Sequence, residues 1–177
     1  MVGLLFAAFW VGCGGNPLGK QVKEPFQGRQ YESNNRFYRS TGKASSKQDA
    51  IAQSKAEVQA RQGLAQQLQT TIQAVSDNYA KDVQGEHVNE AIERFETLVR
   101  EVTNTTLTDV RVIGREKYVD AEGMYTVYVA MEIRKAAMYR HMKKLARADE
   151  RLSKAALEDI ERLLDEKIEE AEAGPEE

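Results

Sequence analysis

The chain has 177 residues, a net charge of −3 and 41% hydrophobic residues. This length suits one domain with a hydrophobic core and flanking tails, and the near-balanced charge argues against nucleic-acid binding, for which a clustered basic excess is typical. The one cysteine, Cys13, excludes an internal disulfide and argues against a cysteine-based zinc site.

An apolar, uncharged run occupies residues 2–12. Its length matches the hydrophobic region of a signal peptide, about 7–15 residues, and it is too short to cross a bilayer as a helix, which takes about 20 residues. Small Gly12 stands directly before Cys13. This arrangement resembles a bacterial lipobox, which implies a signal peptide at residues 1–12 and a lipid anchor, built from fatty acids such as palmitate, on Cys13.

Two departures from the lipobox leave an alternative open. Trp10 stands where a lipobox usually has an aliphatic residue, and no Lys or Arg precedes the apolar run. The alternative is a short uncleaved anchor or a buried N-terminal helix, with Cys13 incidental. Lipidation would anchor the protein stably, because each buried CH₂ of two or three acyl chains contributes about 0.8 kcal/mol. We therefore expect a lipid-anchored protein of the outer membrane, with its domain facing the periplasm or the cell surface.

Residues 13–35 are expected to form a flexible tether that begins at the lipidated Cys13. They contain Pro17 and Pro25 among Gly, Gln, Asn and Lys, and they show no apolar periodicity. We expect the folded domain at residues 36–135.

Residues 36–44 are rich in aromatic and β-favouring side chains and are expected to form a strand. Ser45 and Ser46 then offer an N-cap for a long helix, whose apolar residues recur at steps of three, four and seven. Its expected buried face consists of Ile51, Val58, Leu64, Ala65, Leu68, Ile72, Val75 and Tyr79. A break at Gly85 precedes a second helix with the apolar stripe Val88, Ile92, Phe95, Val99 and Val102.

The hydrophobic period changes to two in the next part of the chain. In residues 107–119 apolar and basic side chains alternate, which predicts a half-buried strand. Residues 120–123 predict a turn that ends in Gly123, and residues 124–133 predict the return strand of a hairpin. One face of that strand would carry Tyr125, Val127, Val129, Met131 and Ile133.

A C-terminal amphipathic helix is expected at residues 136–173, followed by an acidic tail at residues 174–177. The narrow apolar stripe between charged flanks suits packing against a single partner helix. That partner is either the first long helix or a neighbouring subunit. The order of elements predicts an α+β domain, in which two helices cover one face of a three-stranded antiparallel sheet.

Several segments together resemble the LPP-twenty family of small bacterial outer-membrane lipoproteins. Residues 37–44 match its aromatic-x-x-x-Gly-x-Ala strand, and residues 50–65 match its Ala-rich helix ending in Ala-x-x-x-Leu-Ala. Residues 106–114 and 126–133 match its hairpin, so the resemblance covers about residues 36–135. It implies a dodecin-like β-α-α-β-β fold, no catalytic motif and, as in flagellar basal-disc members, assembly into rings beneath the outer membrane.

The sequence shows no catalytic or metal-binding constellation, so we expect neither enzyme activity nor a cofactor. His87 and His141 lie in different predicted helices and neither has a histidine four residues away, which favours surface positions over a metal site. Tyr118, Tyr125 and Tyr128 lie on the predicted hairpin. Packing within the sheet is the favoured interpretation for them, and a stacking platform for a partner is the alternative.

These features predict a structural or adaptor protein of the cell envelope. Its expected partners are the membrane, through Cys13, and either further copies of the chain or another envelope protein, with no nucleic acid. The alternative function is a periplasmic module that binds a small ligand or peptidoglycan.

Overall fold

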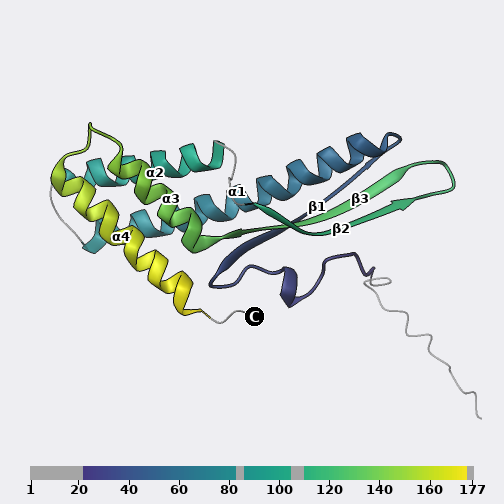
Figure 1. Ribbon diagram of the computed structural model, residues 1–177, viewed down its shortest axis with the longest axis horizontal. Helices are drawn as coiled ribbons and strands as arrows, with labels where there is room; N and C mark the ends of the chain where they lie inside the picture. Colours follow the sequence, from purple (N-terminus) through teal and green to yellow (C-terminus); the bar gives the residue numbers. More distant parts are fainter. Residues whose placement is uncertain (1–21, 83–85, 105–109, 175–177) are drawn as a thin grey trace, which may run out of the picture.

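The computed structural model describes residues 22–82, 86–104 and 110–174. Within these ranges the chain is an α+β protein with one three-stranded antiparallel sheet and four α-helices, which confirms the predicted class and the predicted sheet (Figure 1). The elements are the short 3₁₀ helix η1 (Arg29–Tyr31), β1 (Phe37–Ser46), α1 (Asp49–Asp82), α2 (Glu86–Asn104), β2 (Arg111–Val119), β3 (Tyr125–Arg134), α3 (Lys135–Arg147) and α4 (Lys154–Ala173).

The strand order is β1-β3-β2, so the hairpin places β3 in the centre of the sheet. The predicted turn is confirmed: the amide of Gly123 donates to the carbonyl of Asp120 at 3.1 Å, and Gly123 has a φ of 75°, which favours glycine. Alternation along β3 is confirmed as well. Its core-facing residues Val127, Val129, Met131 and Ile133 are all buried.

Strand β2 differs from the half-buried strand that was predicted, because most of it is exposed. A bulge between Val112 and Gly114 shifts its register against β3. Beyond the bulge, Arg115 and Lys117 point to the same side as the core and reach α1, where they pair with Glu57 at 2.7 Å and Asp49 at 2.5 Å. Ion pairs, rather than apolar contacts, therefore join this edge strand to the helix.

The half of α1 that lies along the sheet buries small side chains. Its sheet-facing row is Ala52, Ala56 and Ala60, whereas Ile51 and Val58 are 38% and 51% exposed. The predicted burial of Ile51 and Val58 is therefore wrong. The cause is the close approach of α1 to β1: a Cβ placed on Gly42 would lie 2.0 Å from the carbonyl oxygen of Ala56. Large aliphatic side chains do not fit into such a narrow gap.

The other half of α1 belongs to a helical bundle. Helix α2 packs against α1, α3 and α4 and not along the sheet, so the expectation that two helices cover the sheet is corrected (Figure 1). Large side chains fill this part of the core: Leu64, Leu68, Ile72, Phe95, Leu98, Met142, Ile160 and Leu164. The molecule thus has a thin end, made of the sheet and one helix, and a thick end made of helices.

The predicted single C-terminal helix is two helices, α3 and α4, which pack against each other. Ser153 ends the turn between them, because its hydroxyl accepts a hydrogen bond from the amide of Ala156 at 3.2 Å as the N-cap of α4. Both the amide and the hydroxyl of Ser153 also donate to Glu90 of α2, at 2.8 and 2.6 Å. The apolar stripe of this region packs between α3 and α4 and against α2, and not mainly against the first long helix α1, which was one of the two predicted partners.

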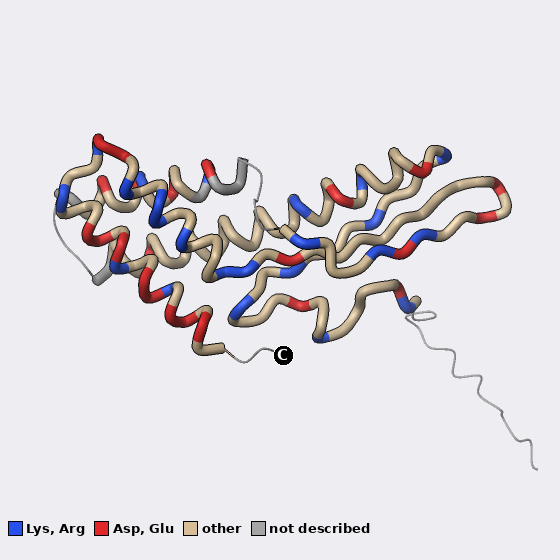
Figure 2. The backbone as a smooth tube through the Cα atoms, in the orientation of Figure 1, with Lys and Arg blue, Asp and Glu red and all other residues tan. Residues whose placement is uncertain are grey.

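Opposite charges accompany the packing of α3 on α4. Basic residues gather on α3 and acidic residues on α4 (Figure 2). Lys143 pairs with Asp165 at 2.6 Å and Arg147 pairs with Glu161 at 2.5 Å. Each exposed pair of this kind contributes little to stability. Together they favour the antiparallel packing of α3 and α4 over a parallel one, in which these residues would not meet.

Candidate functional site

The face of the sheet that points away from α1 carries two aromatic side chains, of which Tyr118 is exposed and Tyr128 is half-buried. Tyr118 of β2 and Tyr128 of β3 meet edge to face, with 5.9 Å between ring centroids and an interplanar angle of 90°. The Lys43 ammonium from β1 lies 5.2 Å from the centroid of the Tyr128 ring, within cation–π range. Tyr118 remains 51% exposed. We call these three residues the tyrosine patch.

Only two of the three tyrosines singled out in the sequence lie together. Tyr125 is three positions from Tyr128 on the same strand, and side chains of a strand alternate between faces. It therefore points to the opposite face, where it packs against the hydrophobic core. The predicted cluster of three is corrected to a pair, and Tyr125 takes the core role that was the favoured interpretation.

Acidic partners fix the protonation of the tyrosine patch. The hydroxyl of Tyr118 donates to Glu116, and this hydrogen bond raises the pKa of Tyr118. Lys43 donates to Glu24 at 2.5 Å, which raises the pKa of Lys43. Near neutral pH the lysine is therefore charged and the tyrosine is neutral. The patch offers aromatic surface and hydrogen bonds, and neither group is available as a base.

The segment before β1 lies against this same outer face. Gly114, Ala130 and Thr41 are neighbours across the three strands there, and their small side chains leave room for Phe26. The approach is close, since a Cβ on Gly114 would lie 2.5 Å from the Phe26 ring. Phe26 also meets Tyr31 edge to face at 5.0 Å.

The flexible tether predicted for residues 13–35 is therefore corrected over residues 22–35. Aromatic contacts hold these residues on the sheet, although the segment has no apolar periodicity. Cys13 and the predicted signal peptide at residues 1–12 lie outside the described residues.

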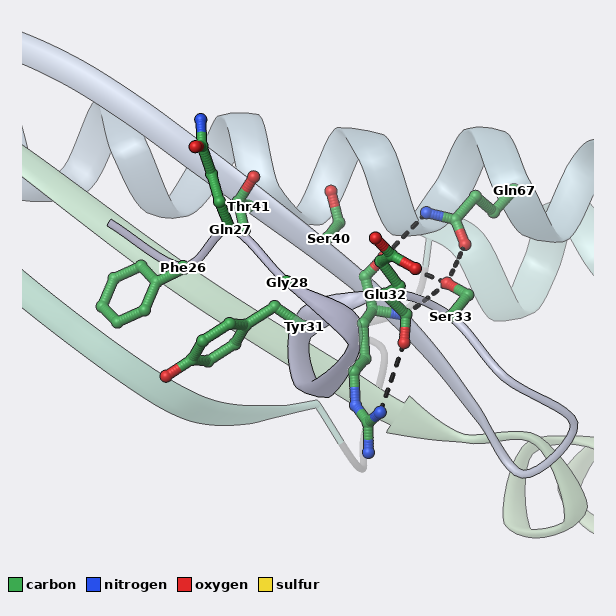
Figure 3. Close-up of a pocket in the computed structure, with 10 residues that line it drawn as sticks. Phe26, Gln27, Gly28, Tyr31, Glu32, Ser33, Ser40, Thr41 and Gln67 are labelled. Atoms are coloured by element: carbon green, nitrogen blue, oxygen red, sulfur yellow. Dashed lines mark hydrogen bonds between the residues drawn. The ribbon is translucent and has the colours of Figure 1, made fainter. Parts of the chain in front are cut away.

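Two grooves flank this N-terminal segment. The first has a volume of about 590 Å³ and lies between the segment, β1 and Gln67 of α1 (Figure 3). Its polar groups bind one another: the Ser33 hydroxyl donates to Gln67 at 2.5 Å, Gln67 donates to the carbonyl of Arg39 at 2.8 Å, and Arg39 pairs with Glu132 at 3.0 Å. This network fastens the segment to the domain, and it leaves few of these polar groups for a ligand.

The second groove has a volume of about 520 Å³ and contains the tyrosine patch. We call it the tyrosine groove. It is lined by Lys23, Pro25, Lys43, Ser45, Tyr118, Thr126 and Tyr128. Aromatic rings, a cation and hydroxyl groups in one open depression suit the binding of an extended polar chain, such as a peptide or a glycan. This groove is the candidate functional site.

Lys43, Lys23 and Pro25 are members of the site that sequence reasoning missed. The available signal was Pro25-Phe26 followed by Tyr31, which places aromatic residues in an otherwise polar stretch. Of the two histidines, His141 is half-buried in α3, and the side chain of His87 lies outside what the structure describes. Within the described ranges, His, Cys, Asp and Glu side chains form no group of three that could hold a metal ion.

Comparison with known protein families and with characterised proteins finds no match to this chain. Among the helices that the structure describes, none combines the length and the apolar character needed to cross a membrane.

Proposed function

We propose that this protein is a membrane-anchored lipoprotein of the bacterial cell envelope with a structural or adaptor role. In this proposal Cys13 carries the lipid and the tyrosine groove binds the partner. The observation that carries the adaptor role is the Tyr118–Tyr128 pair on the outer face of the sheet, in which Tyr118 is 51% exposed and Tyr128 is half-buried. Tyrosine is enriched at protein interfaces because its ring is apolar and its hydroxyl can stay hydrated.

The position of the groove suits an anchored adaptor. Lys23 and Pro25 line the groove, and Lys23 is ten residues from Cys13 in the sequence. A fully extended chain of that length spans about 35 Å. A lipid on Cys13 would therefore keep the groove within about that distance of the membrane surface, where an envelope partner would be met.

The resemblance to the LPP-twenty family supports the same proposal. We infer from it that the sheet and α1 form a dodecin-like unit and that the chain assembles with further copies, as in ring-forming members of that family. Localisation in the outer membrane, with the domain facing the periplasm or the surface, belongs to this proposal as well.

Anchoring is tested by growing the producing bacterium with labelled palmitate. The full chain is expected to incorporate label and to fractionate with the outer membrane, and Cys13→Ser is expected to lose both properties. An unlabelled wild-type chain, or label that survives Cys13→Ser, contradicts the lipoprotein proposal.

Partner binding is tested with a photo-crosslinking amino acid placed at position 118 in the living cell. Position 58 is the matched control, because Val58 is as exposed as Tyr118, at 51%, and lies on α1. We expect a discrete crosslinked species from position 118 and none from position 58. A species of twice the chain mass would identify a second copy as the partner. Equal crosslinking from both positions would refute a specific role for the groove.

A second candidate function is the binding of a glycan such as peptidoglycan in the same groove. Ser45 and Thr126 favour it, because their hydroxyls hydrogen-bond to each other at 2.8 Å beside the rings and resemble the polar groups that orient sugars. Sedimentation with purified cell-wall sacculi decides between the two functions. If the glycan proposal holds, wild type should co-sediment with the sacculi and Tyr118→Ala should not. If wild type does not co-sediment, the glycan proposal is refuted.

A further inference from the structure

A third space, more enclosed than the two grooves, lies where the sheet meets the helical bundle. Its volume is about 290 Å³, the size of a pocket for a small ligand. Tyr38 of β1, Thr71 of α1, Lys135 and Tyr139 of α3, and Lys167 and Glu170 of α4 contribute to its walls, together with Asn35 and Ala171. Five separate parts of the chain thus converge on one small space.

The ammonium of Lys135 is the unusual group in this cavity. It lies 4.3 Å from the centroid of the Tyr38 ring, and burial is the main cause that lowers the pKa of Lys135. Among the described residues, no carboxylate forms an ion pair with it. A charge that is partly removed from water normally has a paired anion. Lys135 has none, so it gives the cavity an excess positive charge.

Neighbouring charges do not remove this imbalance. Lys167 also lines the cavity, but its ammonium contacts both oxygens of Glu170, at 2.7 and 2.6 Å. These two groups neutralise each other and add no net charge. The cavity as a whole therefore carries one excess positive charge, at Lys135.

A hydrogen-bond donor is also left over. The hydroxyls of Tyr38 and Tyr139 lie 3.0 Å apart, and both residues are 3% exposed. Two hydroxyls carry two hydrogens, and the bond between them uses only one. The remaining hydrogen has no acceptor among the described residues, and leaving a buried donor unpaired is unfavourable.

We propose that this cavity binds the carboxylate of a small organic acid. The carboxylate would accept hydrogen bonds from the Lys135 ammonium and from the spare hydroxyl hydrogen of the tyrosine pair, while the rings of Tyr38 and Tyr139 contact the apolar part of the ligand. A single negative charge balances the excess charge of the cavity. This site is separate from the tyrosine groove and shares none of its residues.

The experiment titrates the full chain with benzoate and follows binding by calorimetry, with benzamide as an uncharged probe of the same shape. Benzoate is expected to bind and benzamide is not. Lys135→Met keeps most of the side-chain length and removes the charge, so it should weaken benzoate binding about tenfold or more, as expected for the loss of one charged hydrogen bond. Lys144→Met is the matched control, because Lys144 is exposed on the same helix, and it should bind benzoate like wild type.

Two results would overturn the proposal: equal affinity for benzoate and benzamide, or unchanged benzoate affinity in Lys135→Met. If Lys135→Met does not fold, Tyr139→Phe supplies the test, since it removes the spare hydrogen and retains the ring. We expect a loss of roughly threefold to tenfold in that variant, and unchanged binding there would also refute the site.

Discussion

The two ends of α1 are packed by opposite means. At the sheet end the helix backbone approaches β1 so closely that only glycine and alanine fit, at Gly42, Ala52, Ala56 and Ala60. At the bundle end the same helix meets α2 across a layer of large side chains such as Leu68 and Phe95. One continuous helix therefore tolerates different substitutions along its length. The sheet end is sensitive to added volume, and the bundle end is sensitive to removed volume.

The largest effect is expected from removing volume at the bundle end. Phe95 is 1% exposed and is among the largest fully buried side chains in the described residues. Phe95→Ala should lower the free energy of unfolding by about 3–5 kcal/mol, because a cavity remains where the ring was. Urea denaturation measures this change. A loss below about 1 kcal/mol would show that the bundle end is loosely packed and would remove the contrast.

Adding one methyl group at the sheet end should have a nearly equal effect. In Gly42→Ala the new Cβ would lie 2.0 Å from the carbonyl oxygen of Ala56 and 2.7 Å from the amide nitrogen of Ala60. Both are backbone atoms that cannot rotate away, so we expect a loss of about 3 kcal/mol in the free energy of unfolding.

Gly63→Ala is the matched control for Gly42→Ala. Its Cβ would meet the hydroxyl of Ser40 at 2.1 Å, and that side chain can rotate. Replacing a helical glycine by alanine also gains up to about 1 kcal/mol of helix propensity. Thermal denaturation should therefore show Gly63→Ala close to wild type. Equal losses in the two variants would refute the close approach at Gly42.

A smaller, pH-dependent effect is expected at the turn between α3 and α4. Asp149 accepts hydrogen bonds from the side chain and the backbone of Arg151, and it lies 2.9 Å from Arg94 of α2. The hydrogen bonds from Arg151 are the main cause that lowers the pKa of Asp149 to about 2. Because the folded-state pKa lies below the unfolded value, the stabilisation is present above about pH 4 and is lost as the pH falls toward 2.

Melting temperatures of wild type and Asp149→Asn, measured from pH 6 to pH 2, test this expectation. Wild type should be more stable than the variant at pH 6, and the difference should shrink as the pH falls from about 4 to about 2. A difference that stays constant over this range would show that Asp149 does not carry the pH dependence.

The smallest effect is expected on the solvent-exposed face of α1. Val58 is 51% exposed although the sequence predicts its burial, so Val58→Ala should change the free energy of unfolding by less than about 0.5 kcal/mol. Leu64→Ala, about two turns further along the same helix, should cost about 2–5 kcal/mol because Leu64 is 1% exposed. Chemical denaturation of the two variants compares both values directly. Similar losses would mean that Val58 is covered in solution, for example by a second copy of the chain.

The candidate site was predicted from the sequence only in part. Tyr118 and Tyr128 were singled out because they lie on the hairpin, and both do line the tyrosine groove. Proximity in the sequence groups Tyr125 with them, whereas its position on the strand places it on the other face. Lys23 and Pro25 could not be assigned to the groove, because the aromatic residues Phe26 and Tyr31 indicate that the segment packs on something but not which face of the sheet it covers.

The break in the C-terminal region shows the same limit. The apolar stripe continues from α3 into α4 with nearly regular spacing, so periodicity alone predicts one helix. Ser153 was a usable N-cap signal. The hydrogen bonds that hold Ser153 at the end of the turn go to Glu90, which is 63 residues away in the sequence.

The sequence by itself determined the features that depend on neighbours along the chain. The hairpin follows from alternation and from Gly123, and the α+β class follows from the change of hydrophobic period. Only the tertiary structure decided that alanines, and not Ile51 and Val58, face the sheet in the first half of α1, and where the last helix breaks. Both depend on contacts between separate elements, such as Gly42 against Ala56 and Ser153 against Glu90, which no local pattern records.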